Sequence, residues 1–333
     1  MPNLVAQIAP QRSTQYAQLA TQLAPYELAL SPLGAKITDL QPVTLGGQAY
    51  LRFDYAGEVD EALLTEVGSL AMTSAYFEYY DHVEPIGGPL LKPLMPTYAP
   101  FLPPDIAEAR RYRGKTNEML TLFMLNVARH SSAFAHRPWQ TLRVYDPLAG
   151  GGTTLLTALV LGAEVAGSDE DREAIDGIAR FIRQYTKEAR ISCKLREEKI
   201  KNVGKRWWAE IKQGDTVRRC LMARGDVGDG AKLLHGFKKP HVIVTDLPYG
   251  IQHSGALTEL LQKALPVWAE VLDEGGTLVF SWDATRFSRE DMVGLVREAR
   301  YFTVLDEAPY NQLTHRVDRV IQQRDILVAR LTT

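Results

Sequence analysis

The sequence predicts an α/β protein built around a mostly parallel sheet with helices on both faces, preceded by a smaller α+β domain. From about residue 106 to the C-terminus, apolar strand-like runs alternate with amphipathic stretches of helical period, and this alternation is typical of a parallel sheet. The segment 84–105 contains seven prolines in 22 residues. This predicts an extended linker, because proline lacks an amide donor and disfavours helix at the preceding residue. We place a domain boundary there, between an N-terminal domain at 1–100 and a larger domain at 101–333.

The N-terminal domain shows both helical and strand periods. Helices are predicted at 11–30 and 59–70, and strands at 35–43, 48–55 and 71–80, the first two joined by a Gly-Gly turn. This mixture predicts an α+β unit, for which we expect a substrate-docking role.

The larger domain begins with a helix predicted at 117–134, where apolar residues recur at helical spacing. The strands that follow are predicted at 141–147, 163–169, 239–248, 275–282, 302–310 and 319–331. The intervening helices are predicted at 153–162, 171–189, 256–272 and 289–300. Parallel strands connected in this way present their carboxyl ends at one edge of the sheet.

Composition excludes several classes of protein. A formal net charge of −2 and a pI near 6.4 argue against a protein that coats nucleic acid through a uniformly basic surface. No apolar run approaches the roughly 18 residues that span a membrane, and the N-terminus lacks the features of a signal peptide. The two cysteines, Cys193 and Cys220, are too few for a disulfide framework, and the histidines are scattered without metal-ligand spacing. We expect a cytoplasmic protein with no metal and no membrane partner.

A glycine-rich loop follows the first strand of the larger domain. The strand ends at Asp146, Pro147 and three consecutive glycines follow, and Thr153 opens the next helix. In open α/β sheets the ligand lies outside the carboxyl ends of the strands, where glycines let it approach the backbone closely. We therefore predict that Asp146, Pro147, Gly150, Gly152 and Thr153 contact a nucleotide-like ligand. A purely structural glycine turn is the alternative.

Two other nucleotide motifs match only in part. In the dinucleotide pattern G-x-G-x-x-G counted from Gly150, the third glycine is replaced by Leu155, which weakens an NAD interpretation. The stretch ARRYRGKT is similar to a phosphate-binding P-loop, but Ala109 stands in place of its first glycine and no strand precedes it.

Two further acids follow later strands. Asp169 ends the second strand, about twenty residues past the glycines, where an acid suits hydrogen bonding to ribose hydroxyls; its neighbour Asp171 is explained as a helix N-cap. Asp226 is a candidate acceptor for an adenine amino group, with a turn or cap residue as the alternative.

The stretch VIVTDLPYG at 242–250 ends an apolar strand in an acid, a proline and an aromatic ring. A simple strand end with a turn is one explanation. The other is a clamp for a flat, amine-bearing ring, in which the Asp246 carboxylate and the Leu247 carbonyl accept the two amine hydrogens. Tyr249 would stack on the ring and Pro248 would stiffen the turn, so these four are the predicted catalytic residues.

The motifs DPLAGGGT, GSD, GD and TDLPYG occur in an order that resembles the Rossmann-like (class I) S-adenosylmethionine-dependent amino-methyltransferases. More narrowly, they resemble the tRNA guanine-N2 methyltransferases and their THUMP-associated relatives, which carry D-P-x-x-G-x-G-T and [DN]-x-P-[YF]-G. Here Leu247 stands where that family frequently has proline. The resemblance covers about 106–333, including YRGKTNEMLTLFMLNVA and HRVDRVIQQRDILVARL. It implies S-adenosyl-L-methionine as the cofactor and a nucleobase amine as the methyl acceptor.

Positive charge is concentrated in one segment. From Lys187 to Arg224 there are twelve Lys or Arg against five Asp or Glu, and we interpret 187–224 as a basic insert that contacts RNA phosphates. The candidate contacts are Lys201, Lys205 and Arg206, together with Lys115 ahead of the first helix of the larger domain. A solvated helix of mixed charge is the alternative for the insert.

The leading hypothesis is an RNA N-methyltransferase that forms N2-methylguanosine, with tRNA as its partner. One alternative is a DNA amino-methyltransferase acting on adenine N6 or cytosine N4, which would need base flipping; no DNA-recognition segment is evident after residue 255. Another is a nucleotide-binding protein without catalysis, which loss of the acid at 246 or of the glycines would favour. A dehydrogenase is disfavoured because the third glycine is absent.

Overall fold

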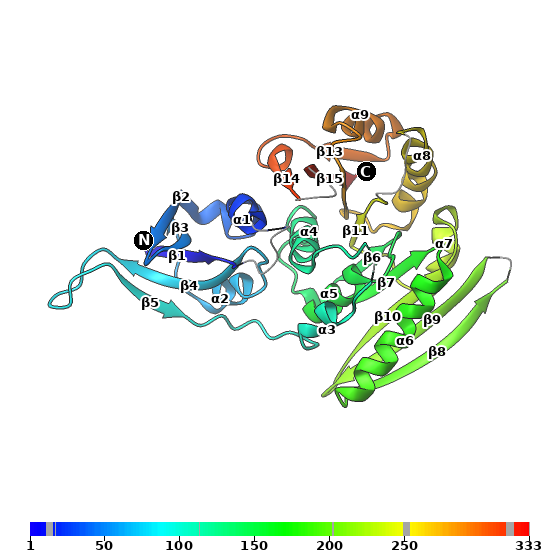
Figure 1. The fold of residues 1–333 in the computed structure, drawn as a ribbon, viewed down its shortest axis with the longest axis horizontal. Helices are drawn as coiled ribbons and strands as arrows, with labels where there is room; N and C mark the ends of the chain where they lie inside the picture. Colours follow the sequence, from blue (N-terminus) through cyan, green and yellow to red (C-terminus); the bar gives the residue numbers. More distant parts are fainter. Residues whose placement is uncertain are drawn as a thin grey trace.

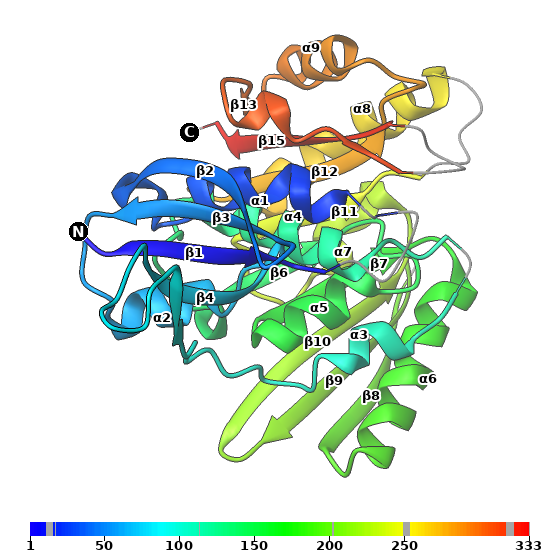
Figure 2. The same cartoon turned by 60° about the vertical axis from the view of Figure 1, so that its left-hand side comes forward.

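The computed structural model describes residues 1–10, 16, 18–112, 114–201, 203–248, 254–317 and 323–332. The predicted α/β fold class is confirmed: a large, mostly parallel, Rossmann-like sheet is accompanied by a smaller antiparallel sheet in the N-terminal part (Figures 1 and 2). The division of the chain into domains near residue 100 stays a prediction.

The N-terminal sheet is antiparallel throughout. In spatial order its strands are β2 (Ile37–Leu45), β3 (Gln48–Tyr55), β1 (Asn3–Ile8), β4 (Thr73–Tyr80) and β5 (Leu90–Leu94). Its helices are α1 (Leu19–Leu30) and α2 (Glu61–Val67). The three predicted strands are confirmed, as are the two helices within their described residues; residues 11–15 and 17 of the first helix lie outside these.

Strand β5 corrects one expectation. Its residues belong to the proline-rich segment predicted as an extended linker, yet they pair with β4, with Pro93 opposite Phe77 and Leu91 opposite Tyr79. Proline is tolerated because β5 is an edge strand, where one side of the backbone makes no ladder hydrogen bonds. Strand β1 is a second element that the sequence analysis does not predict.

The centre of the larger sheet consists of five parallel strands. In spatial order its strands are β13 (Phe302–Leu305), β15 (Gln323–Leu331), β12 (Thr277–Asp283), β11 (Val242–Asp246), β6 (Arg143–Asp146), β7 (Glu164–Asp169), β10 (Thr216–Arg224), β9 (Gly204–Gln213) and β8 (Ser192–Ile200), with β14 (His315–Arg316) beside β15. Strands β12, β11, β6, β7 and β10 run parallel, whereas β15 and β9 are antiparallel to their neighbours. The chain proceeds from β6 to β7 on one side and later to β11 on the other. Open α/β sheets bind ligands at such a switch point.

Helices cover both faces of this sheet. They are α3 (Asp105–Ala109), α4 (Glu118–His130), α5 (Thr153–Leu161), α6 (Arg172–Glu188), α7 (Gly230–Leu233), α8 (Ser254–Val271) and α9 (Arg289–Ala299). Val144 and Val242 belong to a buried cluster with α4, α5 and α6 that continues into the N-terminal sheet. Their neighbours Tyr145 and Ile243 face the opposite cluster, with α8 and α9, because successive strand residues point to opposite faces.

Buried polar contacts also join the N-terminal part to α4. Glu66 at the end of α2 accepts hydrogen bonds from Arg129 and from His130, whose Nε2 lies 2.9 Å away. Burial opposes ionisation of Glu66, but the hydrogen bond from His130 and the charge of Arg129 outweigh it and lower its pKa to about 2. Asn126 of α4 donates to Glu27 of α1 at 2.8 Å.

The basic insert at 187–224 forms strands, so the alternative of a mixed-charge helix is wrong. Strand β8 begins at the edge of the sheet opposite the carboxyl ends, and its turn into β9 reaches the carboxyl edge. Lys205 in β9 lies opposite Arg224, which in turn pairs with Asp169 at the end of β7. The third strand of the insert, β10, belongs to the parallel sheet itself.

Candidate active site

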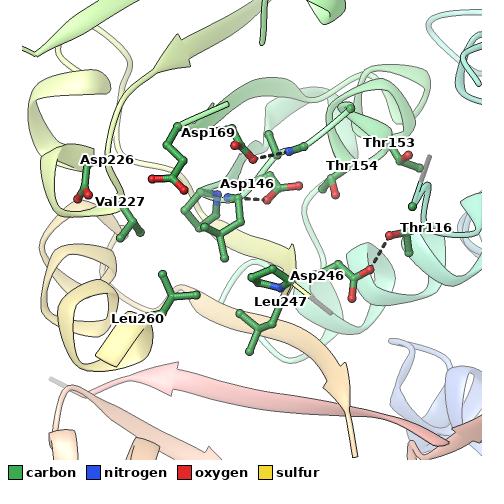
Figure 3. Close-up of a pocket in the computed structure, with 18 of the residues that line it drawn as sticks. Thr116, Asp146, Thr153, Thr154, Asp169, Asp226, Val227, Asp246, Leu247 and Leu260 are labelled. Carbon is green, nitrogen blue, oxygen red and sulfur yellow. Dashed lines mark hydrogen bonds between the residues drawn. The ribbon is translucent and has the colours of Figure 1, made fainter. Parts of the chain in front are cut away.

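A cavity of about 550 Å³ opens at the carboxyl edge of the parallel strands. Four of the acids singled out from the sequence line it: Asp146, Asp169 and Asp246 are the last residues of β6, β7 and β11, and Asp226 follows β10 by two residues. Figure 3 shows these carboxylates arranged around one space, although they lie at the ends of four different strands. The volume of the cavity is within the range of about 300–1,000 Å³ usual for small-ligand sites.

The loop between β6 and α5 requires glycine at its three positions for two different structural reasons. Gly150 and Gly152 have φ angles of +45° and +89°, in the left-handed region that favours glycine. A Cβ on Gly151 would lie 2.2 Å from the ring of Tyr112, so the ring packs directly on the backbone there. Gly150 and Gly151 both line the cavity, which leaves backbone rather than side chains on that wall.

Asp146 is buried beneath the glycine loop. One carboxylate oxygen accepts hydrogen bonds from Thr245 Oγ1 at 2.7 Å and from the Leu148 amide at 3.1 Å. Burial raises the pKa of Asp146 to about 7 despite these donors. Near neutral pH the group therefore titrates, and a positively charged ligand would favour its ionised form.

Asp169 holds the glycine loop to the next turn. Its Oδ2 accepts from the Gly150 amide at 2.8 Å and its Oδ1 accepts from the Asp171 amide at 2.9 Å. Asp171 in turn caps α6 by accepting from the Glu173 amide at 2.8 Å, as its N-cap interpretation predicts. Glu170 also lines the cavity and was not identified from the sequence.

Asp226 is paired with a lysine that the sequence analysis missed. Lys263 of α8 lies with its Nζ 2.6 Å from Asp226 Oδ2, and the Gly228 amide donates to Oδ1 at 2.6 Å. The hydrogen bond from Lys263 holds the pKa of Asp226 below its usual range. The residue is thus both a turn cap and part of the cavity wall. Lys263 is separated from Asp226 by 37 positions, so no local pattern indicates the pair.

Asp246 is held by donors from three other segments. Thr116, in the loop before α4, donates to Oδ2 with 2.5 Å between the oxygens, and Ser281 of β12 donates to Oδ1. The buried Arg324 of β15 lies with Nη2 3.7 Å from Oδ2. The Leu247 amide donates to the Ser281 carbonyl at 2.9 Å, which fixes the following peptide. A proline at this position would lack that amide donor, and the Leu247 side chain packs in the core.

Pro248 completes this wall of the cavity. Tyr249, the predicted stacking residue, lies outside the described residues. Pro147 and Thr153 also line the cavity, and the Thr153 hydroxyl lies 2.5 Å from that of Tyr112.

The cavity is acidic. Among the described residues that line it, the acids are Asp146, Asp169, Glu170, Asp226 and Asp246, and the one cation is Lys263. Such walls favour a ligand with positive charge and hydroxyl donors over one that carries phosphates.

Two of the four predicted RNA contacts have their donors occupied within the protein. Arg206 is buried and donates to Glu198 at 2.7 Å and to the His235 carbonyl at 2.6 Å. Lys115 donates to the Ala107 carbonyl at 2.6 Å. The positions of Arg206 and Lys115 do not support a phosphate contact, because their charged groups are hydrogen-bonded within the protein and shielded from solvent.

The other two predicted contacts lie near the turn between β8 and β9. Lys205 is ion-paired with Glu197 at 2.7 Å, and its Nζ lies 4.4 Å from the ring centroid of Trp207. Lys201 is exposed in the turn. Trp207 and its neighbour Trp208 are buried and belong to the hydrophobic clusters on opposite faces of the sheet.

Within the described ranges, no grouping of three or more metal-ligating side chains occurs. The helices of the same ranges fall short of the length and apolar character that a membrane span requires.

No family model matches the sequence, and no curated protein matches it significantly. Among solved structures, the chain is similar to TrmN from Thermus thermophilus, with 14% identity over 100% of both chains and a TM-score of 0.48. It is also similar to the T. thermophilus 16S rRNA N2 G1207 methyltransferase RsmC in complex with AdoMet and guanosine, with 15% identity, 96% of this chain and 63% of that chain covered, and a TM-score of 0.40. A putative RNA methyltransferase from Pyrococcus horikoshii matches with 17% identity, 71% of this chain and 94% of that chain covered, and a TM-score of 0.40.

Proposed function

We propose that this chain is an S-adenosylmethionine-dependent N-methyltransferase that acts on RNA and forms N2-methylguanosine in tRNA. The observation that carries the proposal is the position of Asp246, whose carboxylate lines the same cavity as the glycine loop, Asp169 and Asp226. A nucleoside cofactor at the loop and an amine held at Asp246 would therefore share one space.

The chemistry of the cavity wall fits S-adenosyl-L-methionine. A sulfonium cation and ribose hydroxyls suit five carboxylates, whereas the diphosphate of a dinucleotide would meet Lys263 alone among the described lining cations, and Lys263 is already paired with Asp226. When bound, the cofactor supplies a methyl group on a positively charged sulfur.

Asp169 and Asp226, which are predicted to bind the cofactor, can each accept further hydrogen bonds. Each oxygen of Asp169 and of Asp226 accepts one hydrogen bond within the protein from the donors described above. A carboxylate oxygen has a second lone pair. We assign Asp169 to the ribose hydroxyls and Asp226 to the adenine amino group. Gly150, Gly151 and Thr153 line the loop wall of the cavity, whereas the predicted contact Gly152 does not line it and serves the turn through its positive φ. Asp146 beneath the wall supplies negative charge.

The catalytic contribution of the chain is to hold and orient the acceptor amine. An exocyclic amine conjugated with a base is a poor nucleophile, since its lone pair is delocalised into the ring. Acceptance of its two hydrogens by the Asp246 carboxylate and the Leu247 carbonyl would favour a pyramidal nitrogen with its lone pair directed at the methyl group. Alignment of this kind supplies much of the rate of a two-substrate reaction. Asp246 is also placed to take the proton that the amine loses on methylation.

The test is methyl transfer from labelled S-adenosylmethionine to unfractionated tRNA, ribosomal RNA and duplex DNA, followed by digestion and mass spectrometry of the nucleosides. N2-methylguanosine in tRNA is the expected product. Methylated adenine or cytosine in DNA would instead establish the DNA amino-methyltransferase. Cofactor binding without transfer to any of the three would favour a binding protein.

A further inference from the structure

We infer that the open face of β8, β9 and β10 is a binding surface for the phosphate backbone of the substrate RNA. This inference rests on the proposed function, because it takes the substrate to be RNA. It assigns the contact to residues other than those predicted from the sequence.

The three strands have two different faces. Cys193 and Leu195 of β8, like Trp207 of β9, pack in the cluster that includes α6, and α6 contacts β8 and β10 (Figure 1). Side chains at the alternate positions point away from α6. Lys194 and Arg196 of β8 are therefore on the open face.

The strand register aligns the open-face side chains in rows. Lys194 lies opposite Glu210 of β9, which lies opposite Arg219 of β10. In the next row Arg196 lies opposite Trp208. Side chains directly opposite one another on neighbouring strands are close enough to interact, so three cations, the indole and the carboxylate of Glu210 occupy adjoining positions.

These rows line a cavity of about 620 Å³. Its floor includes Trp208, whose ring lies 6.3 Å from that of Phe237, and its rim includes His235 and Gly236 after α7. The loop of the rim is fixed by Arg206, which donates to the His235 carbonyl. Arg206 thus shapes this surface rather than contacting RNA itself.

Two cations of the surface, Lys194 and Arg196, are exposed and make no direct hydrogen bond or ion pair to another described residue. The pKa of Glu198, which lines the same cavity, is nevertheless lowered by the hydrogen bond from Arg206 and, in smaller part, by the charge of Arg196. Arg219 donates a hydrogen bond from Nε to Glu164 at 2.9 Å, and the other N–H groups of its guanidinium remain as donors. Exposed cations that lie close together and retain free donors suit a polyanion.

Strand β10 connects the surface to the candidate active site: Arg219 lies beside the start of β7, and the strand then runs to the carboxyl edge. The strand ends at Arg224, and Asp226 of the cofactor cavity follows two residues later. In a chain of net charge −2, a polyanion needs a local cationic surface. A polynucleotide is long enough to reach from this surface to the carboxyl edge, because Arg219 lies five strand residues before Arg224, roughly 16 Å away. An acidic protein partner is the other class of ligand, and unchanged tRNA binding by the charge-removing variant in the experiment below would favour it over RNA.

The test measures binding of unfractionated tRNA to the full chain by filter binding between 50 and 200 mM KCl. The double variant Lys194→Gln with Arg196→Gln is expected to bind more weakly and to lower the slope of log affinity against log salt by about 1.4–1.8, which corresponds to two lost phosphate contacts. The advantage of the unmodified protein then shrinks about tenfold between the two salt concentrations. Lys194→Arg with Arg196→Lys keeps both charges and is expected to bind normally.

The matched control is Lys187→Gln with Lys199→Gln. It removes the same charge from exposed positions on α6 and on the opposite face of β8, and it is expected to leave both affinity and slope unchanged. Equal losses in the two double variants, or no change in the first, would overturn the inference, as would binding of tRNA with an unaltered salt slope. Binding of S-adenosylmethionine, measured by calorimetry in every variant, separates this failure from failure of the proposed function.

Discussion

Thr116 donates a hydrogen bond to Asp246 across 130 positions of sequence, with 2.5 Å between Oγ1 and Oδ2. Ser281, on a neighbouring strand, donates to the other carboxylate oxygen. Both oxygens are therefore held from separate elements, so in the proposed reaction the plane of the carboxylate would be set before the acceptor base binds. Preorganised acceptors of this kind contribute more to a rate than mobile ones, because they need no reorganisation during the reaction.

Replacement of Asp246 by Ala is expected to lower the rate of methyl transfer by at least about 10²–10³-fold, the loss usual for a preorganised polar group at a reacting centre. Affinity for S-adenosylmethionine should stay within about twofold, since Asp169 and Asp226 are untouched. Single-turnover transfer and calorimetry measure the two quantities. Retention of most of the rate would contradict the amine-clamp assignment.

Replacement of Thr116 by Val is expected to lower the rate about tenfold, because one hydrogen bond to a charged group is lost while the carboxylate remains. Thr116→Ser keeps the hydroxyl and should restore the rate, and neither variant should alter the affinity for the cofactor. A rate for Thr116→Val equal to that of the unmodified protein would show that the bond to Asp246 does not position it for the reaction.

Replacement of Asp169 by Ala is expected to weaken binding of S-adenosylmethionine by about 1–3 kcal/mol, as lost hydrogen bonds to a charged group do. Asp171→Ala is the matched control, since Asp171 caps α6 two residues away. It should lower the free energy of unfolding by about 1 kcal/mol and leave cofactor affinity unchanged. Calorimetry that finds the larger loss in the control would reverse the assignment.

The affinity for S-adenosylmethionine is expected to rise with pH between about 6 and 8. Burial raises the pKa of Asp146 to about 7, so the carboxyl is mostly neutral below that pH and mostly ionised above it. A cationic ligand favours the ionised form, so binding should release protons near pH 7. Calorimetry in buffers of different ionisation enthalpy measures this release. Asp146→Asn should remove both the release and the pH dependence, and their persistence in that variant would rule out Asp146 as the source.

Replacement of Glu66 by Gln is expected to lower the free energy of unfolding by about 3 kcal/mol at pH 7, because it leaves the buried Arg129 without its partner. The folded-state pKa of Glu66, about 2, is below its ordinary value of 4.5. Its stabilising contribution is therefore present above pH 4.5 and is lost as the pH falls toward 2. Urea unfolding at several pH values should show the difference from the unmodified protein narrowing over that interval. Glu61→Gln, at an exposed position of the same helix, should have little effect at any pH.

Much of the fold was predictable because its signals are local. The alternation of strands and helices after residue 106 follows from hydrophobic period, and the positions of Asp146, Asp169 and Asp246 follow from the ends of the apolar runs. Strand β5 was missed because its prolines argue against a strand when the neighbouring strand is not known. The insert at 187–224 was ambiguous because its alternating charges have no apolar period that separates helix from strand.

Local sequence was enough to place four acids and a glycine loop at the carboxyl edge of a parallel sheet, since each of them directly follows or ends a strand. The way in which these acids are held depends instead on the folded chain. The side chains that contact Asp246 and Asp226 belong to segments between 35 and 130 positions away, and no local pattern encodes such contacts: Thr116, Ser281, Arg324 and Lys263. Folding also determines which cations of the basic insert are exposed. Burial and internal hydrogen bonds occupy Arg206, whereas strand alternation directs Lys194 and Arg196 to the open face.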